Sequence, residues 1–144
     1  MSAYRRIGHA CRHNLNYSQV GDYIGIGAGA HGKRTLTAPW RVERGWRVKH
    51  PEAYLRTAGS ALTIAGRRVL DRSDLLVEFM MNSLRLKAGF AVGLFTERTG
   101  EDETRLWESL ESPLQRGLLV LEEGRIRASA SGWLFLDDVI GEFL

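Results

Sequence analysis

Apolar residues in the second half of the chain recur at helical spacing. After Ser73 they return every three or four positions as far as Gly89, at Leu76, Val77, Met80, Met81 and Leu84. This period predicts an amphipathic helix, and Ser73 is a residue type that caps helix N-termini. A short helix is expected from Val92 to Thr99, ending at Gly100.

The next segment predicts a longer helix, from about Asp102 to Arg116, with Pro113 bending its end. Its inward positions are expected to be Leu106, Trp107, Leu110 and Leu114. Two short apolar runs follow, 118–121 and 126–129, around a turn that contains Gly124, and they predict a β-hairpin. A last helix is expected from Gly132 to Leu144, with one face formed by Leu134, Phe135, Val139, Ile140 and Phe143.

Residues 1–50 show little helical periodicity and look like loops. Short extended segments are expected at 23–26 and 45–48. A helix is expected to begin after His50, with Pro51 at its first position, and to stop near Gly59. Residues 66–72 resemble a basic connector.

This order of elements indicates an α+β chain. We expect a winged-helix-like domain at residues 73–144, because such a domain has three helices, then a hairpin and then a further helix. Residues 51–72 then form a helix and basic connector, and residues 1–50 a glycine-rich N-terminal part.

Composition and charge narrow the functional classes. The 144 residues are 44% apolar and 26% charged, which is typical of one soluble globular domain. No apolar run approaches the ~20 residues of a membrane span, and no export signal is evident, so a cytoplasmic protein is expected. The single cysteine, Cys11, permits no intrachain disulfide.

Charge is distributed unevenly along the sequence. Residues 1–72 hold 13 Lys and Arg against 4 Asp and Glu, a net charge of +9, whereas residues 73–144 hold 7 against 13, a net charge of −6. A non-enzymatic winged-helix adaptor or nucleic-acid binder is an alternative to consider. The helix expected at 102–116 would read DNA in such a domain, but residues 101–116 carry a net charge of −3. Because phosphates repel that charge, nucleic-acid binding is disfavoured.

Two motifs in the first half invite a chemical interpretation. Gly27, Gly29 and Gly32 form a G-x-G-x-x-G, but β-branched residues and Pro39 follow where a dinucleotide site needs a helix. His9, Cys11 and His13 carry metal-binding groups, with His31 or His50 as a possible fourth, although the spacing is not that of a structural zinc site.

Catalytic arrangements are less convincing. Asp137-Asp138 and Glu122-Glu123 are adjacent pairs, and adjacent residues do not face one another on a helix or strand. Ser18 or Ser60 with His13 and Asp22 lacks the sequence of a nucleophile elbow. No complete active site is therefore predicted from the residues alone.

A family resemblance appears in two motifs, His13-Asn14-Leu15-Asn16-Tyr17 and the stretch from Gly21 to Gly32, GDYIGIGAGAHG. Together they resemble the radical S-adenosylmethionine proteins related to oxygen-independent coproporphyrinogen III oxidase, and most closely their heme-chaperone branch. The resemblance continues through Lys49-His50-Pro51, the stretch 78–86, Arg98-Thr99-Gly100, Gly117-Leu118-Leu119 and the stretch 132–138.

The resemblance implies that residues 1–50 are a remnant of the end of a partial α/β barrel. Family members bind a 4Fe-4S cluster through a Cys-x-x-x-Cys-x-x-Cys loop, and one cysteine cannot replace three thiolates. The chain is thus expected to be a C-terminal fragment, inactive by itself. Apolar surface that a barrel would cover is expected to be exposed and to promote self-association, for example at Ile24, Ile26, Trp40 and Trp46.

The same resemblance implies which residues meet ligands. Contact with the S-adenosylmethionine cofactor is expected from Gly25, Gly27, Gly29, Ala30 and His31. The substrate or heme side is expected to involve His13, Asn14, Asn16 and Tyr17. Porphyrin carboxylates suit the basic side chains of Arg12, Lys33 and Arg34, and Cys11 and His31 are candidate iron ligands.

Overall fold

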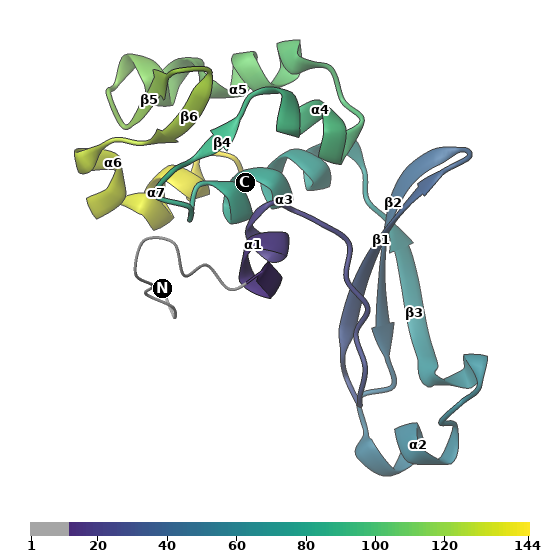
Figure 1. Cartoon of the computed structure of the whole chain (residues 1–144). Helices are drawn as coiled ribbons and strands as arrows, with labels where there is room; N and C mark the ends of the chain where they lie inside the picture. Colours follow the sequence, from purple (N-terminus) through teal and green to yellow (C-terminus); the bar gives the residue numbers. More distant parts are fainter. Residues whose placement is uncertain (1–11) are drawn as a thin grey trace. The chain divides into compact units, whose positions relative to one another are not determined.

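The computed structural model describes residues 12–144 as two compact units, one made of Asp22–Asp71 and the other of the flanking residues up to Gly21 and from Arg72 onward (Figure 1). The chain enters the first of these units after residue 21 and leaves it after residue 71. Both contain helices and small antiparallel sheets, so the α+β class is confirmed. None of the helices in residues 12–144 has the length and apolar character needed to cross a membrane.

The larger unit has the core. Its helices are α1 (Arg12–Ser18), α3 (Arg72–Ser83), α4 (Gly93–Thr99), α5 (Glu103–Gln115), α6 (Ala130–Leu134) and α7 (Leu136–Gly141). Its sheet has the order β4-β6-β5, with β4 at Phe90–Ala91, β5 at Leu119–Glu122 and β6 at Arg125–Ala128. The predicted hairpin is β5 and β6, and the three predicted helices α3, α4 and α5 precede it in the chain.

Phe79 stands at the centre of this core. Its ring meets those of Phe90 and Phe95 edge to face, with centroids 4.9 and 5.2 Å apart. All three rings are buried, as are Leu106 of α5 and Ile126 of β6. Edge-to-face contacts suit the ring quadrupole, so α3, α4 and β4 are fixed around one aromatic side chain.

Helix ends follow the expected chemistry at two places. Gly100 has φ 69° and ends α4 in the left-handed conformation, as predicted. Asp102 precedes α5, and its carboxylate accepts a 2.7 Å hydrogen bond from the backbone N–H of Thr104. The ordinary pKa of Asp102 is lowered because Thr104 donates to the ionised form.

Several predicted core positions were wrong. Helix α3 begins at Arg72, so Ser73 lies inside it, and Leu75 and Phe79, which the pattern did not mark, are buried. Met80 and Leu84, which it did mark, are fully buried as well. Met81 is exposed, because α3 is apolar on almost every side and the period alone did not fix its orientation. Trp107 lies at the surface of α5.

The last predicted helix is two short ones. Phe135 separates α6 from α7 with φ −115° and ψ 33°, outside the helical range. Leu134 and Phe135 are therefore exposed, whereas Val139, Ile140 and Phe143 are buried as predicted.

The smaller unit is a three-stranded antiparallel sheet in the order β1-β2-β3. The strands are β1 (His31–Thr37), β2 (Trp40–Arg47) and β3 (Ile64–Val69). The turn Ala38-Pro39, with a cis peptide bond, joins β1 to β2. Helix α2 (Pro51–Arg56) has the predicted Pro51 start, and a 3₁₀ turn (Ala61–Thr63) follows.

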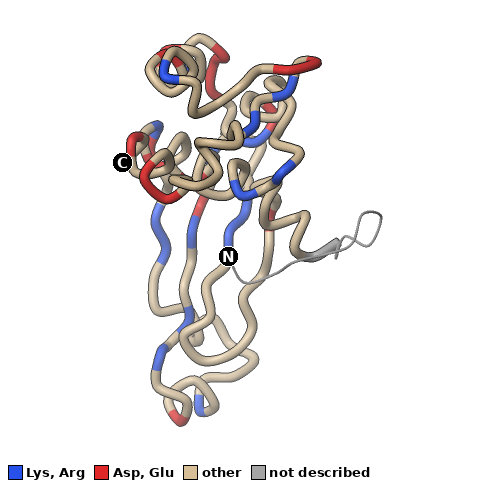
Figure 2. The backbone as a smooth tube through the Cα atoms, turned by 90° about the vertical axis from the view of Figure 1, so that its left-hand side faces the viewer, with Lys and Arg blue, Asp and Glu red and all other residues tan. Residues whose placement is uncertain are grey.

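Most of this sheet was missed in the sequence. Residues 66–72, expected to be a connector, contribute to β3 and the start of α3, and the predicted loops 31–37 and 40–44 are strands. Lys and Arg occur on all three strands (Figure 2), which obscures the alternation of apolar and polar residues that indicates a strand. Helix α1 was missed as well.

Gly132 provides a test of packing in the larger unit. A Cβ at this position would overlap the carbonyl oxygen of Leu118, a backbone atom that side-chain motion cannot remove. We expect Gly132→Ala to lower the free energy of unfolding by about 1–3 kcal/mol, measured by urea denaturation and circular dichroism.

Gly141→Ala is the matched control, since nothing lies within 4 Å of a Cβ at that helical position. It should leave stability unchanged or raise it slightly, within about 1 kcal/mol. Equal effects of the two substitutions would contradict the packing of α6 on Leu118.

Candidate anion-binding pocket

The glycine-rich loop is held along the edge of β1. The backbone N–H of Tyr23 donates to the Lys33 carbonyl at 3.0 Å, and the Lys33 N–H donates to the Tyr23 carbonyl at 2.9 Å. Asp22 continues this pairing through its side chain, accepting from the backbone N–H of Thr35 at 2.7 Å and from its hydroxyl at 2.9 Å. The carboxylate thus takes the place of a strand carbonyl.

The far end of the loop is fixed by three further contacts. The N–H of Gly29 donates to the Val48 carbonyl at 2.8 Å, and the N–H of Arg47 donates to the Ala30 carbonyl at 2.9 Å. The N–H of Gly27 donates to the hydroxyl of Tyr54 in α2 at 3.2 Å. The loop is therefore tied to β2 and α2 and is not a free connector.

The fold itself needs these glycines. Gly27 and Gly29 have φ of 111° and 68°, a region that side-chain-bearing residues rarely adopt. A Cβ on Gly25 would overlap the carbonyl oxygen of His31. Strand β1 follows at once, so the G-x-G-x-x-G at 27–32 does not open a helix and is not a dinucleotide fingerprint, as the sequence indicated.

A pocket of about 230 Å³ lies within the smaller unit. The register pairs Gly32 with Gly45 and Gly45 with Arg67, so these three residues form one row across β1, β2 and β3 on one face of the sheet. Two adjacent glycines leave this face hollow. Gly32 and Gly45 line the pocket, as do Ile24 and Gly25 of the loop and Ile64 of β3.

The next row of the same face carries an ion cluster. Arg34 pairs with Glu43 across β1 and β2, and its Nε and Nη2 donate to Glu43 Oε2 at 3.0 and 2.7 Å. Arg41 Nε donates to Oε1 of the same carboxylate at 2.9 Å. These bonds from Arg41 and Arg34 lower the pKa of Glu43 below its ordinary value.

Arg47 borders the pocket on the other side of the glycine row. Its Nη1 donates to Thr63 Oγ1 at 2.7 Å, and its Nε lies 3.4 Å from the Gly25 carbonyl oxygen. Both acceptors are neutral. Three arginines, Arg34, Arg47 and Arg67, and one carboxylate, Glu43, line the pocket from this face, so their formal charge is +2. Lys33 also lines the pocket, but it pairs with Arg44, so its side chain belongs to the opposite face.

The structure groups some of the predicted ligand residues. Gly25, Ala30, Lys33 and Arg34 all line this pocket. Lys33 is buried at 3% exposure, whereas His31 is exposed at the start of β1. The sequence did not single out Glu43, Gly45, Arg47 or Arg67, because only the strand register brings them together.

The second predicted group lies in the larger unit. His13, Asn14, Asn16 and Tyr17 belong to α1, which packs on α3. The exposed residues include Asn14, Asn16 and Tyr17. A Cβ on Gly21 would overlap the Asn16 side chain, so that amide packs against the chain where it leaves α1.

Metal sites receive no support from the described part of the chain. Residues 12–144 contain no group of three or more His, Cys, Asp and Glu side chains placed to hold an ion. The candidates His9 and Cys11 lie outside the described residues.

The exposed apolar side chains predicted for the smaller unit are confirmed: Ile24 and Ile26 are 82% and 85% exposed, and Trp40 and Trp46 are also at the surface.

Glu43 gives the pocket a pH dependence. Because its pKa is lowered in the folded state, its ion cluster stabilises the protein above the ordinary value of 4.5, and this contribution is lost as pH falls through the lowered value. We expect Glu43→Gln to be less stable than wild type at pH 7. Urea midpoints should converge as the pH approaches 3, and a constant difference would contradict the assignment.

Comparisons with known proteins agree with the resemblance seen in the sequence. Residues 70–135 match the HemN C-terminal domain family. The chain is 34% identical to the heme chaperone HemW of Haemophilus influenzae over 143 residues, 99% of this chain and 36% of that protein. It is also 34% identical to the heme chaperone HemW of Mycobacterium tuberculosis, covering 100% of this chain and 34% of that protein.

A solved structure has the same fold. Coproporphyrinogen III oxidase (HemN) from Escherichia coli, a radical SAM enzyme, superposes with a TM-score of 0.52 at 17% identity, over 85% of this chain and 28% of that one. The chain spans about a third of the length of the curated relatives it matches. The domain match and the similarity over nearly the whole chain together relate this chain to HemN and HemW proteins, and its residues 70–135 to the HemN C-terminal domain.

Proposed function

We propose that the chain is the C-terminal part of a cytoplasmic radical S-adenosylmethionine protein that handles porphyrin or heme. The similarity to heme chaperones over nearly the whole chain carries this proposal. It also favours heme chaperoning over coproporphyrinogen oxidation, since the likeness to the oxidase is one of fold at 17% identity.

The residues of this chain do not fit a 4Fe-4S cluster. Such a cluster needs several thiolates, and Cys11 is the only cysteine. We therefore assign the cluster and most of the S-adenosylmethionine site to a barrel outside these 144 residues. The chain contributes binding surfaces and no radical chemistry of its own.

The glycine loop is our candidate for the cofactor side of the complete protein. Gly25, Gly27, Gly29 and Ala30 keep backbone groups near the surface without large side chains, and His31 follows them with an exposed imidazole. Backbone without side chains permits close approach of a ligand.

Each unit has its own candidates for contact with heme. In the larger unit, His13, Asn14, Asn16 and Tyr17 of α1 would meet the macrocycle or its iron, and Arg12 its carboxylates. In the smaller unit, Arg34 would pair with such carboxylates. Lys33 is a weaker candidate than Arg34, because its side chain is buried.

Hemin binding tests this assignment. We expect hemin to shift its Soret band on titration with the chain, and His31→Ala to abolish the shift, since an exposed imidazole is a suitable axial ligand. His50→Ala is the matched control, because His50 is also an exposed histidine of the smaller unit. A shift that survives His31→Ala would remove His31 as the iron ligand.

Self-association follows from the exposed apolar side chains of the smaller unit. At concentrations of ~100 μM we expect the isolated chain to elute from size-exclusion columns as an oligomer, because large apolar patches associate. Ile24→Ser with Ile26→Ser should shift it toward the monomer, as both side chains are more than four-fifths exposed. Leu55→Ser, at another exposed apolar site, is the control, and a strictly monomeric wild type would contradict the proposal.

A further inference from the structure

Arg67 differs from the other cationic residues of the pocket in having no partner. Arg34 is bound to Glu43, and Arg47 donates to Thr63. Arg67 forms no hydrogen bond or ion pair with any residue in the described range 12–144. Its side chain is exposed on β3 at the rim of the pocket, next to Gly45.

The one carboxylate of the pocket is already occupied. Both oxygens of Glu43 accept from arginines, Oε2 from Arg34 and Oε1 from Arg41. Its charge is shared between those two guanidinium groups. Arg67 therefore keeps an uncompensated positive charge. Even without Arg67, the cavity is lined by more cationic than acidic residues.

The cavity suits only part of a ligand. About 230 Å³ is below the ~300–1,000 Å³ of sites that enclose a whole small molecule. Ile24 and Ile64 give it apolar walls, and the glycine row gives it a floor without side chains. A cavity of this shape can hold one edge of an apolar ligand that carries an anionic group.

We propose that Arg67 is the anion-binding residue of this pocket, taking a carboxylate or phosphate on a largely apolar ligand in bidentate fashion. A planar guanidinium matches both oxyanions. The inference deepens the proposed function by naming the ligand chemistry of the same pocket, and in part it rests on that proposal. A porphyrin would present a carboxylate to Arg67, and a nucleotide-like ligand would present a phosphate.

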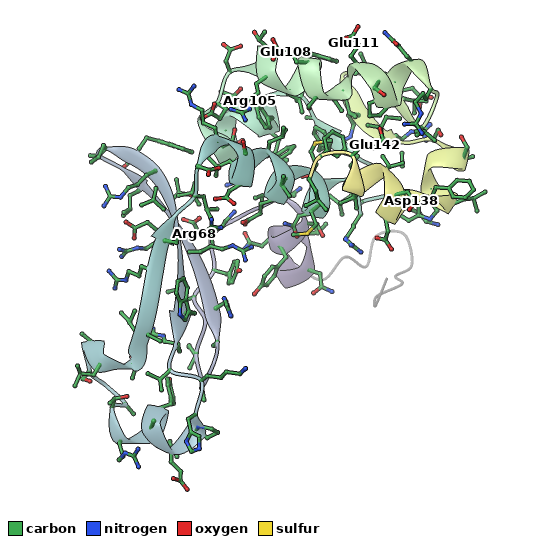
Figure 3. The ribbon with its side chains drawn as sticks, turned by 180° about the vertical axis from the view of Figure 1, so that it is seen from behind. Arg68, Arg105, Glu108, Glu111, Asp138 and Glu142 are labelled. Carbon is green, nitrogen blue, oxygen red and sulfur yellow. The ribbon has the colours of Figure 1, made fainter. Side chains whose placement is uncertain are left out.

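The strand provides a matched control residue. Arg68, which is labelled in Figure 3, follows Arg67 on β3. It pairs with Arg44, so it lies on the opposite face of the sheet and does not line the pocket. Substitution of either arginine by glutamine removes one positive charge from β3. Any difference in binding affinity between the two variants therefore depends on where the positive charge is lost and not on the net charge.

The test titrates the 144-residue chain with coproporphyrin III and, separately, with pyrophosphate, by calorimetry. We expect Arg67→Gln to weaken binding of at least one probe about tenfold, since a hydrogen bond between charged groups is lost. Arg68→Gln should stay within about twofold of wild type. Equal affinities of the two variants for both probes, or no binding of either probe to wild type, would overturn the inference.

The two probes separate this inference from the proposed function. Pyrophosphate binding that depends on Arg67, with no porphyrin binding, would support the anion site and count against porphyrin as its ligand. Porphyrin binding that is indifferent to Arg67, with no Arg67-dependent binding of pyrophosphate, would leave the proposed function standing and remove the anion site.

A second variant keeps the test valid if Arg67→Gln alters the fold. A Cβ on Gly45 meets only ordinary contacts, 3.6 Å from the Gly66 carbonyl oxygen and 3.7 Å from Arg67 Cγ, and valine is well suited to a strand. Gly45→Val should fill the floor of the pocket and weaken binding about tenfold with an unchanged circular dichroism spectrum. Undiminished binding in a folded Gly45→Val variant would overturn the inference.

Discussion

The register of β1 against β2 is the constraint on which the site depends. The short turn after Thr37 pairs that residue with Trp40, and every later pair follows, including Gly32 with Gly45 and Arg34 with Glu43. A slip of one residue would move each side chain to the other face. Gly32 would then no longer lie beside Gly45 and Arg67, and the Arg34 and Glu43 pair would be broken.

The glycine loop shows how one segment meets the needs of the fold and of a ligand. Asp22 and Tyr23 cover the edge of β1, which would otherwise present unpaired backbone groups. Gly25 is required by close packing on His31, and Gly27 by its backbone conformation. Packing against β1 thus explains part of this glycine-rich motif. A ligand bound at the loop would place a second constraint on the same residues.

The charges of the larger unit do not suit DNA binding, the alternative that its predicted order of elements raised. Glu108 and Glu111 project from the outer side of α5 (Figure 3), the helix that would enter the major groove if this unit bound DNA as winged-helix proteins do. Carboxylates there would face phosphates. Residues 70–135 of this unit instead match the HemN C-terminal domain.

The sequence by itself determined the family resemblance, the α+β class and the elements marked by local chemistry, such as Pro51 at the start of α2, Gly100 at the end of α4 and the β5–β6 hairpin. These signals act within a few residues, so they can be read along the chain. The tertiary structure decided which side of α3 faces Phe90 and Phe95 and which residues surround the pocket. Gly45 and Arg67 are 22 positions apart, and only hydrogen bonding between β2 and β3 makes them neighbours.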